Sequence, residues 1–357
     1  MARITLERVG HRYGHAPYAL EPFDMVLEDG RSYALLGPSG CGKTTMLNII
    51  SGVVRPSEGR ILLDDRDVTV VPISGRNVAQ VFQFPVIYQS KSVYENLAFP
   101  LRCRRWPIAR IKARVAEIAD LLDLSGRLGK PAWQLTVDEK QLISLGRGLV
   151  RDDVAALLMD EPLTVIDPQM KFQLRRKLKA VSQKARHTVI YVTHDQNEAM
   201  TFADEILVMS AGKVVQRGTP QELFERPRTT YVGYFIGSPS MNVFDAEIGA
   251  GGVMIGGTPI APGGALPSGL PTSGLRVGIR PEYASLAQPE DSDTLAATVV
   301  GVQDHGSVRI VEVAIGTARA RLKLGRDIAP PSAQARIRLR RDKLCLFVDD
   351  HLIAAGI

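Results

Sequence analysis

Four short runs of apolar residues recur along the first two thirds of the chain, and each is apolar at consecutive positions. They are "SYALLG" (32–37), "VAALLMD" (154–160), "TVIYVTH" (188–194) and "EILVMS" (205–210). A strand that is apolar on both faces is typical of a parallel sheet covered by helices. These runs therefore predict the buried strands of an α/β domain.

Helical periodicity occurs between these runs. In "IARIKARVAEIADLLDL", apolar residues recur at steps of three and four, namely Ile108, Ile111, Val115, Ile118 and Leu122. This spacing predicts a helix that buries a single apolar stripe. The stretch "QMKFQLRRKLKAVSQKA" predicts a second helix with a basic outer face. Strands that alternate with helices up to residue 235 indicate an α/β fold class.

The pattern changes near residue 236. A stretch rich in glycine and proline, "GGTPIAPGGALPSGLPTSG" (256–274), is followed by segments in which basic and apolar residues alternate, "ARARLKL" (318–324) and "ARIRLR" (335–340). Such alternation is typical of half-solvated antiparallel strands, which predict a small β-barrel or sandwich. We therefore expect two domains, 1–235 and 236–357.

Charge and cysteine content narrow the kinds of ligand and the cellular compartment that are expected. The chain has 44 Lys and Arg residues against 38 Asp and Glu residues, and this net charge of +6 fits an anionic ligand or an acidic membrane surface as well as an ordinary enzyme. It has no long basic block, so no nucleic-acid partner is expected. Three widely separated cysteines argue against a disulfide framework and favour a reducing cytosol. No apolar run approaches the roughly 20 residues that cross a bilayer, so any membrane role requires a partner.

The stretch "GPSGCGKTT" (37–45) fits the pattern G-x-x-x-x-G-K-[ST] between a predicted strand and a predicted helix. Its glycines allow backbone N–H groups to point at phosphate oxygens, beside the positive end of the helix dipole. Lys43 is placed to bind the β- and γ-phosphates of ATP, and the Thr44 hydroxyl to bind Mg²⁺. A glycine-rich turn with a chance lysine is disfavoured, because spacing and context agree. The loop residues expected to contact the nucleotide are Gly37, Ser39, Gly40, Cys41, Gly42, Lys43, Thr44 and Thr45.

Polar residues that follow other strands are candidates for the chemistry. In "ALLMDEP" (156–162), Asp160 would hold Mg²⁺ and Glu161 would act as general base; the alternative is a solvated pair of acids after a strand. His194 follows the next strand and can donate to the γ-phosphate. Gln83 could contact both Mg²⁺ and the attacking water. Tyr13 could stack on adenine or could equally be a core aromatic.

These motifs form an ordered set that resembles the ATP-binding-cassette ATPases, and more narrowly the carbohydrate-uptake importer subunits related to the maltose importer ATPase. "GPSGCGKTT" matches the Walker A loop, Gln83 the Q-loop, "LLMDEP" Walker B and "VTHDQNEAM" the H-loop. "LTVID" matches the D-loop only in part and carries Asp167. "FIGSPSMN" and "GIRPE" (278–282) match the C-terminal OB-like (TOBE-type) domain of these subunits.

The resemblance implies a helical subdomain over about 84–150 and two ATPase domains that close head-to-tail around two ATP molecules. It also implies a peripheral place on the cytoplasmic face of the cell membrane. There the ATPases would drive two membrane permease subunits, to which a binding protein delivers the solute. The stretch "FPVIYQSKSVYENLAF" matches the segment that receives the permease.

The family's signature reads LSGGQ, and this chain has "LTVDE" (135–139) in its place. Thr136 keeps a hydroxyl that can reach the partner's nucleotide. Val137 adds bulk, and Asp138 and Glu139 place negative charge near a phosphate. At an effective dielectric near 20, two charges about 4 Å apart repel by roughly 4 kcal/mol, and the helix dipole offsets at most about 2 kcal/mol of this. The loop should therefore bind γ-phosphate poorly.

The same residues also fit a capping box, in which Thr136 caps the following helix and Glu139 reaches back. Because the residues for the chain's own ATP are intact, we predict an asymmetric dimer with a different ATPase subunit. Importers of glycerol type are the suggested setting. A regulatory nucleotide-binding subunit with little hydrolysis is the alternative. A cassette ATPase of translation or DNA repair is disfavoured, because there is no second cassette or coiled-coil insert.

Overall fold

The computed structural model describes residues 2–249, 252–260, 266–271, 273–288, 291 and 294–356, so the glycine- and proline-rich stretch lies partly outside the described residues. The chain divides into two compact units, Met1–Pro220 and Gln221–Ile357. Each unit has its own hydrophobic core and is considered by itself.

The first unit is an α/β domain, as predicted. Its strands are β1 (Ile4–Arg12), β2 (Tyr18–Leu27), β3 (Ser32–Leu36), β4 (Glu58–Leu63), β5 (Arg66–Asp67), β6 (Ala79–Val81), β7 (Leu157–Asp160), β8 (Val189–Thr193), β9 (Glu205–Ser210) and β10 (Lys213–Gly218). Its α-helices are α1 (Lys43–Ser51), α2 (Ile73–Arg76), α3 (Val93–Cys103), α4 (Ile108–Leu121), α5 (Val137–Leu149), α6 (Pro168–Lys184) and α7 (Gln196–Phe202).

Two sheets organise this unit. The larger sheet has the order β10-β9-β3-β8-β7-β6, in which β9, β3, β8, β7 and β6 are parallel and β10 is antiparallel. All five residues of β3 and of β8 are buried, which explains why both strands are apolar except for Ser32 and Thr193 at their ends. The smaller antiparallel sheet has the order β2-β1-β4-β5 and shares a core with α1. The carboxyl ends of β3, β7 and β8 meet at one edge, where the predicted site residues follow.

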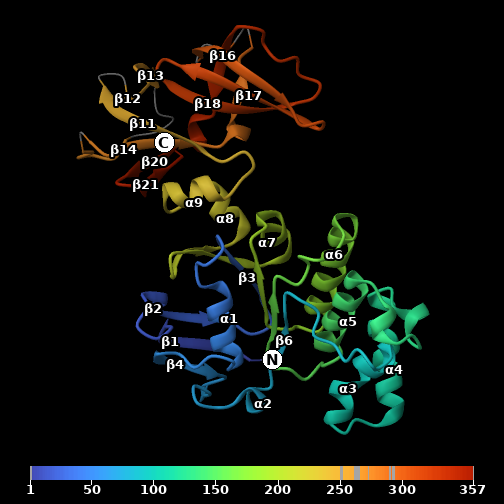
Figure 1. Cartoon of the computed structure of the whole chain (residues 1–357). Helices are drawn as coiled ribbons and strands as arrows, with labels where there is room; N and C mark the ends of the chain where they lie inside the picture. Colours follow the sequence, from blue (N-terminus) through green and yellow to red (C-terminus); the bar gives the residue numbers. More distant parts are fainter. Residues whose placement is uncertain are drawn as a thin grey trace. The chain divides into compact units, whose positions relative to one another are not determined.

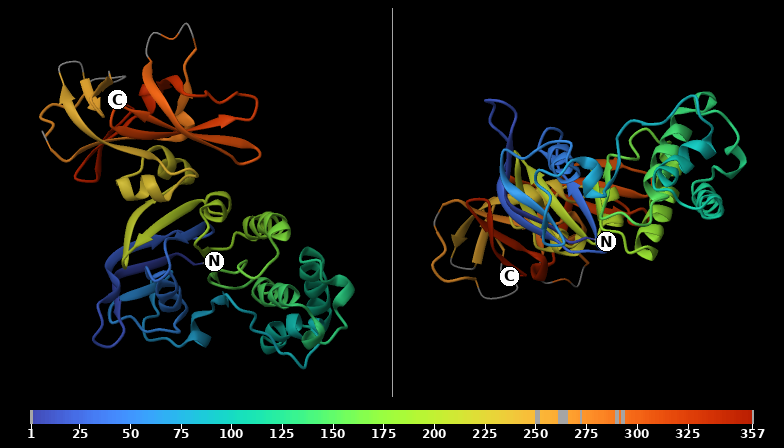
Figure 2. Two further views of the ribbon diagram at one scale, coloured as in Figure 1. Left: turned by 45° about the horizontal axis from the view of Figure 1, so that its top comes forward. Right: turned by 90° about the horizontal axis from the view of Figure 1, so that it is seen from below.

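The helices α3, α4 and α5 pack together in the first unit, away from the smaller sheet, in the predicted helical region (Figures 1 and 2). Ile111, Val115, Ile118 and Leu122 are buried there as predicted. Ile108 is not, because 73% of its surface is exposed. It occupies the first position of α4, at the margin of the core that the rest of the stripe fills.

The second unit begins with helices α8 (Pro220–Glu225) and α9 (Thr230–Phe235) and continues as antiparallel β-structure. One sheet has the order β13-β12-β11-β14-β20-β21 and the other β15-β19-β16-β17-β18. The strands are β11 (Asn242–Gly249), β12 (Gly252–Ile255), β13 (Thr258–Ile260), β14 (Leu275–Ile279), β15 (Ala284–Leu286), β16 (Leu295–Asp304), β17 (Val308–Ile315), β18 (Ala318–Gly325), β19 (Gln334–Leu339), β20 (Cys345–Val348) and β21 (His351–Ala355). Their inner faces form one apolar core, as in a barrel-like β domain.

The alternation predicted for 318–324 is present in β18. Ala320, Leu322 and Leu324 are buried, whereas Arg319 and Arg321 are exposed. The side chains of this strand therefore divide between the apolar core and a basic outer face.

Buried Arg280 ties the two helices to the sheets of this unit. Its guanidinium donates to the carbonyl of Phe224 in α8 (3.0 Å), to the carbonyl of Gly233 in α9 (2.8 Å) and to the carbonyl of Ile236. Only 1% of the residue is exposed, and burial lowers the pKa of the guanidinium to about 10. The compact unit therefore starts at Gln221 rather than at residue 236, because these contacts join α8 and α9 to the β-structure.

Candidate nucleotide site

The phosphate loop joins β3 to α1 and depends on close backbone approach. A Cβ atom on Gly37 would lie 2.4 Å from the carbonyl oxygen of Met209, and one on Gly42 would lie 2.5 Å from the carbonyl oxygen of Ala19. Gly42 also has a φ of 104°, in the left-handed region. Side chains are thus excluded where the loop curls. Lys43 Nζ donates to the carbonyls of Gly37 and Pro38, both at 2.8 Å, and so spans the loop.

Most of the predicted residues line one pocket of about 600 Å³ around this loop. It is lined by Tyr13, Ala19, Ser39, Gly40, Gly42, Lys43, Thr44, Thr45, Gln83, Glu161, Thr164 and His194. Gly37, Cys41 and Asp160 do not line it. Cys41 is buried, and this burial raises the pKa of its thiol. The pocket fits a nucleoside triphosphate, because it combines a curled glycine loop, a lysine at the start of a helix and a volume typical of ligand sites.

Glu161 is the centre of a converging set of donors. Its Oε2 atom lies 3.0 Å from His194 Nδ1, 3.2 Å from Thr164 Oγ1 and 3.5 Å from Gln83 Nε2. A carboxylate only accepts hydrogen bonds, so the proton of the imidazole is assigned to Nδ1. Glu161 follows β7 directly and has a φ of 43°. Three donors from three segments fix the direction of this carboxylate, which favours a positioned general base.

Asp160 lies behind the loop, where its Oδ1 atom accepts from the Thr44 hydroxyl at 3.2 Å. Burial raises the pKa of Asp160, with a further rise from nearby Glu161, while the hydrogen bond from Thr44 and the charge of Lys43 act in the opposite direction. A hydroxyl beside a carboxylate is an oxygen donor set of the kind that Mg²⁺ prefers. The residues at this position therefore fit the predicted metal role.

Replacing Asp160 by Asn is expected to separate stability from function. The raised pKa means that the folded protein tolerates the charged form poorly, so the free energy of unfolding should be unchanged or higher in the variant. Any difference should shrink as the pH falls and the native Asp160 takes up its proton. Magnesium-dependent ATP hydrolysis should fall by about 100-fold or more. Thermal unfolding from pH 8 down to about pH 4, the ordinary range of an aspartate pKa, measures the first effect, and a magnesium titration of the ATPase measures the second. A lower melting temperature at neutral pH would contradict the expectation.

Tyr13 is half exposed at the edge of the pocket. Its hydroxyl lies 3.2 Å from the Thr45 hydroxyl, and its ring packs edge-on against His11 at 4.5 Å between centroids. With 52% of its surface exposed, Tyr13 is not a core aromatic. Stacking on adenine therefore stays as the prediction for this residue.

Gln141 is a site residue that the sequence patterns did not reveal. It lies on α5 and is fully buried, and its Nε2 atom donates to the carbonyls of Phe82 (3.1 Å) and Pro162 (2.9 Å). Phe82 precedes Gln83, and Pro162 follows Glu161. The side chain thus links the helix of the signature loop to both segments that carry the predicted water-activating groups, Gln83 and Glu161. Thr164, which contacts Glu161, was also missed; it lies three residues after Glu161, and no motif distinguishes it.

We expect Gln141→Leu to lower kcat for ATP hydrolysis about tenfold with little change in ATP binding. The substitution removes two buried hydrogen bonds, each contributing about 1 kcal/mol. The distance between Gln83 and Glu161 should then vary more, while the phosphate loop keeps its conformation. Steady-state ATPase kinetics and nucleotide titration measure the two quantities. Leu145→Ala, on the same buried helix, is the control for a general loss of stability. An equal loss of kcat in both variants would assign Gln141 a purely structural role.

The signature segment starts α5 by the predicted capping box. Thr136 Oγ1 accepts from the Glu139 amide at 3.3 Å, and Glu139 Oε2 accepts from the Thr136 amide at 3.0 Å. The other carboxylate oxygen of Glu139 pairs with Arg127 Nε at 2.5 Å. Asp138 has no ion pair or hydrogen bond among the described residues, and 55% of Val137 is exposed. Glu139 is therefore neutralised locally, and Asp138 carries the remaining charge of the loop.

Thr136 and Asp167 do not line the pocket of this chain. Asp167 caps α6, where its carboxylate accepts from the Gln169 amide at 2.8 Å. Their predicted contacts with nucleotide therefore require a second subunit.

Comparison with known proteins agrees with this geometry. The model of the family described as ABC transporter matches residues 20–164. The chain is 40% identical over 302 residues to the sn-glycerol-3-phosphate import ATP-binding protein UgpC 3 of Agrobacterium fabrum, which covers 85% of this chain and 84% of that protein. It is 33% identical to the UgpC protein of Jannaschia sp. over 350 residues, 98% of this chain and 99% of that protein. A solved structure of cbiO1 from Clostridium perfringens, part of the ABC transporter complex cbiONQ, aligns with a TM-score of 0.57 and 27% identity over 62% of this chain and 90% of that chain.

The fold, the phosphate loop and these relatives define the class of the protein as an ATP-binding cassette. Within that class, the chain belongs to the family of ABC transporter ATP-binding proteins that includes the sn-glycerol-3-phosphate import proteins UgpC. Members of this family are ATPases coupled to solute import, and the chain is one of them. In the part of the chain that the structure describes, no helix is long and apolar enough to cross a membrane.

Proposed function

We propose that this chain is the ATP-hydrolysing subunit of an importer for a glycerol-phosphate-like, polyol or sugar solute, and that it acts in an asymmetric ATPase dimer. Mg²⁺ would be held at Thr44, Gln83 and Asp160. Glu161 would take the proton of the attacking water, His194 and Thr164 would keep its carboxylate in place, and Lys43 would neutralise the phosphates. The relatives' role in sn-glycerol-3-phosphate import supports this solute class.

One observation supports the asymmetry most directly. Most groups that would serve the chain's own nucleotide line a single pocket, whereas Thr136 and Glu139 of the signature segment are engaged by each other and by Arg127. Thr136 and Glu139 cap each other and Arg127 binds Glu139, so Asp138 would face the partner's phosphate with an uncompensated charge. A different ATPase subunit with a glycine-containing signature would complete the site on this chain.

The segment after Gln83 is proposed to receive the permease on the cytoplasmic face of the membrane. In this segment Phe84 and Val86 are exposed by 67% and 52%. Phe82, just before Gln83, is exposed by 39% and lines a hollow of about 210 Å³ together with Val86. Exposed apolar residues around a hollow favour a protein contact. Arg147 from α5 donates to the Val86 carbonyl, so this surface is connected to the signature helix.

The asymmetry predicts that the purified chain alone hydrolyses ATP slowly, because each site of a homodimer would contain Asp138. The double variant Val137→Gly, Asp138→Gly should raise its ATPase activity about tenfold or more, since repulsion of several kcal/mol is removed. Alanine at both positions also removes the charge but keeps a Cβ atom, so it shows whether the charge or the close approach of the backbone matters.

Co-expression with the permeases, followed by measurement of ATPase activity and subunit composition, tests the native assembly. A native homodimer with full permease-stimulated activity would refute the asymmetric scheme.

A regulatory subunit that binds ATP with little hydrolysis is the second candidate. The internally satisfied signature segment favours it, whereas the donors around Glu161 favour hydrolysis. Transport assays of Glu161→Gln distinguish the two, because unchanged uptake is expected only for the regulatory subunit.

A further inference from the structure

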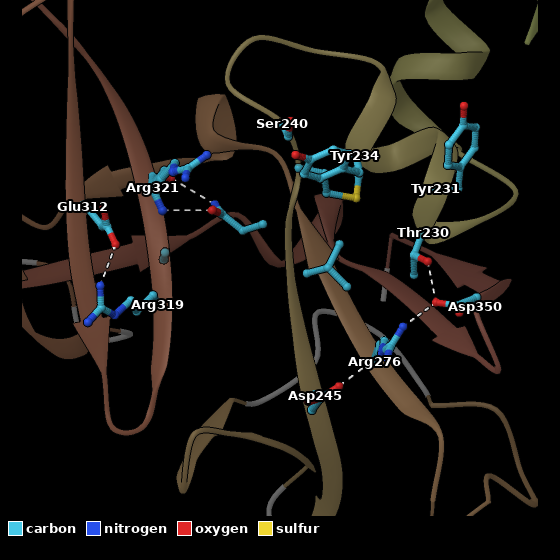
Figure 3. Close-up of a pocket in the computed structure, with 14 residues that line it drawn as sticks. Thr230, Tyr231, Tyr234, Ser240, Asp245, Arg276, Glu312, Arg319, Arg321 and Asp350 are labelled. Atoms are coloured by element: carbon cyan, nitrogen blue, oxygen red, sulfur yellow. Dashed lines mark hydrogen bonds and ion pairs between the residues drawn. The ribbon is translucent and has the colours of Figure 1, made fainter. Parts of the chain in front are cut away.

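The second unit contains a larger pocket than the nucleotide site, with a volume of about 710 Å³ (Figure 3). Its walls come from α9, β11, β14, β17 and β18 and from residues beside them, and its size is within the range of sites for small molecules. The pocket is lined by Thr230, Tyr231, Tyr234, Ser240, Met241, Asn242, Val243, Asp245, Arg276, Glu312, Arg319, Ala320, Arg321 and Asp350. Three arginines and three carboxylates are thus gathered around one cavity.

Two of the three arginines are neutralised by carboxylates. Arg276 pairs with both Asp245 and Asp350, on one side of the pocket in Figure 3. Arg319 pairs with Glu312 at 3.2 Å, on the other side. These arginines have little net charge left to offer a ligand, although their N–H groups and carboxylates can still bond to hydroxyls.

Arg321 differs from the cations on either side of it along β18. Arg319 pairs with Glu312, and Lys323 pairs with Glu282 at 3.1 Å. Glu312 is the cross-strand neighbour of Arg321 but is engaged by Arg319. Among the residues that the structure describes, the Arg321 guanidinium has neither an ion pair nor a hydrogen bond. One uncompensated cation therefore lies at the wall of the pocket.

The backbone of Arg321 is held firmly below this cation. The buried Asn242 donates from Nδ2 to the Arg321 carbonyl at 2.9 Å, and its Oδ1 atom accepts from the Arg321 amide at 2.8 Å. In Figure 3 the Arg321 side chain points toward Ser240 and the hydroxyl of Tyr234. A guanidinium on a fixed backbone, in a pocket that Ser240 and Tyr234 also line, is a donor set suited to a carboxylate or a phosphate.

We infer that this pocket binds a small organic anion that carries hydroxyl groups, with its carboxylate or phosphate at Arg321. The ion pairs of Arg276 and Arg319 supply fixed donors and acceptors for the hydroxyls. Met241, Val243 and Ala320 provide an apolar surface for the carbon skeleton. The inference goes beyond ATP hydrolysis and import, because it assigns a ligand site to the β domain.

The test is calorimetric titration of the full-length chain carrying Lys43→Ala, which removes the phosphate-binding cation of the first unit. The probes are sn-glycerol 3-phosphate, D-glycerate and glycerol. At least one anion should bind measurably while glycerol does not, and the stronger anion shows whether phosphate or carboxylate is preferred. Arg321→Gln should weaken that binding about tenfold or more, since a charge-assisted bidentate contact is lost.

Lys323→Gln is the matched control, because Lys323 lies on the same face of β18 but does not line the pocket. It should change the affinity less than about twofold. Neither variant should alter the thermal unfolding temperature by much, because Arg321 is exposed and the Lys323–Glu282 pair is only partly buried. Equal binding of glycerol and the anions, absence of binding by both anions, or equal effects of the two substitutions would each overturn the inference.

Discussion

Glu161→Gln is expected to lower kcat for ATP hydrolysis by about 100-fold or more while ATP binding is retained, because general base catalysis contributes about two to four orders of magnitude. Glutamine keeps the shape of the side chain and can still accept a hydrogen bond from His194, but it cannot take up the proton of the attacking water. The phosphate loop and Lys43 are untouched, so nucleotide affinity should be unchanged or higher. Single-turnover hydrolysis and equilibrium ATP binding measure the two properties.

Thr164→Val is the control for this experiment. It removes one donor to Glu161 at 3.2 Å but leaves the carboxylate, so the loss of kcat should be at most about tenfold. Retention of more than half the native kcat by Glu161→Gln would show that Glu161 is not the general base. Abolished ATP binding would instead show that the substitution damages the site itself.

Arg280→Met should destabilise the second unit by about 3 kcal/mol or more. The substitution removes hydrogen bonds to the carbonyls of Phe224, Gly233 and Ile236, and it leaves these buried acceptors without their donor. Methionine fills most of the volume, so loss of packing contributes less than loss of hydrogen bonds. Thermal unfolding together with hydrogen exchange of α9 amides should detect early opening of this helix.

Arg338→Met is the matched surface control, since Arg338 is exposed and pairs with Asp291 at 3.1 Å. Its effect should stay within about 0.5 kcal/mol, as is usual for surface positions. Arg280→Lys should restore only part of the stability, because an ammonium lacks the planar fork that reaches several carbonyls. Native stability of Arg280→Met would mean that water or a rearranged chain satisfies these carbonyls.

The sequence predicted the strands and the phosphate loop because both depend on local patterns. The mostly apolar runs became buried parallel strands. Gly37 and Gly42 occupy positions where a Cβ atom would clash, whereas Gly40 has a φ of 78° and open space around it. Ile108 was placed in the core because periodicity does not indicate where the facing surface ends. The boundary near residue 236 followed a change in composition, whereas the compact unit includes α8 and α9 through contacts of Arg280, which is distant in sequence.

The site was less predictable where it depends on tertiary contacts. Gln141 contacts segments near Gln83 and Glu161, and no local pattern distinguishes a buried glutamine from an exposed one on a helix. Arg127 neutralises Glu139 through an ion pair that no local sequence pattern indicates. The predicted repulsion of the signature loop therefore now rests on Asp138 alone.

The self-contained start of α5 has a consequence for subunit contact. Thr136 and Glu139 satisfy each other and Arg127 pairs with Glu139, so a partner need not replace hydrogen bonds to water at these two residues. Asp138 beside them has no partner in the part of the chain that the structure describes, so its carboxylate is the group that makes dehydration of this turn costly. A neighbouring subunit can therefore pack against Thr136 and Glu139 by shape, whereas the charge of Asp138 disfavours binding of that subunit's phosphate at this turn.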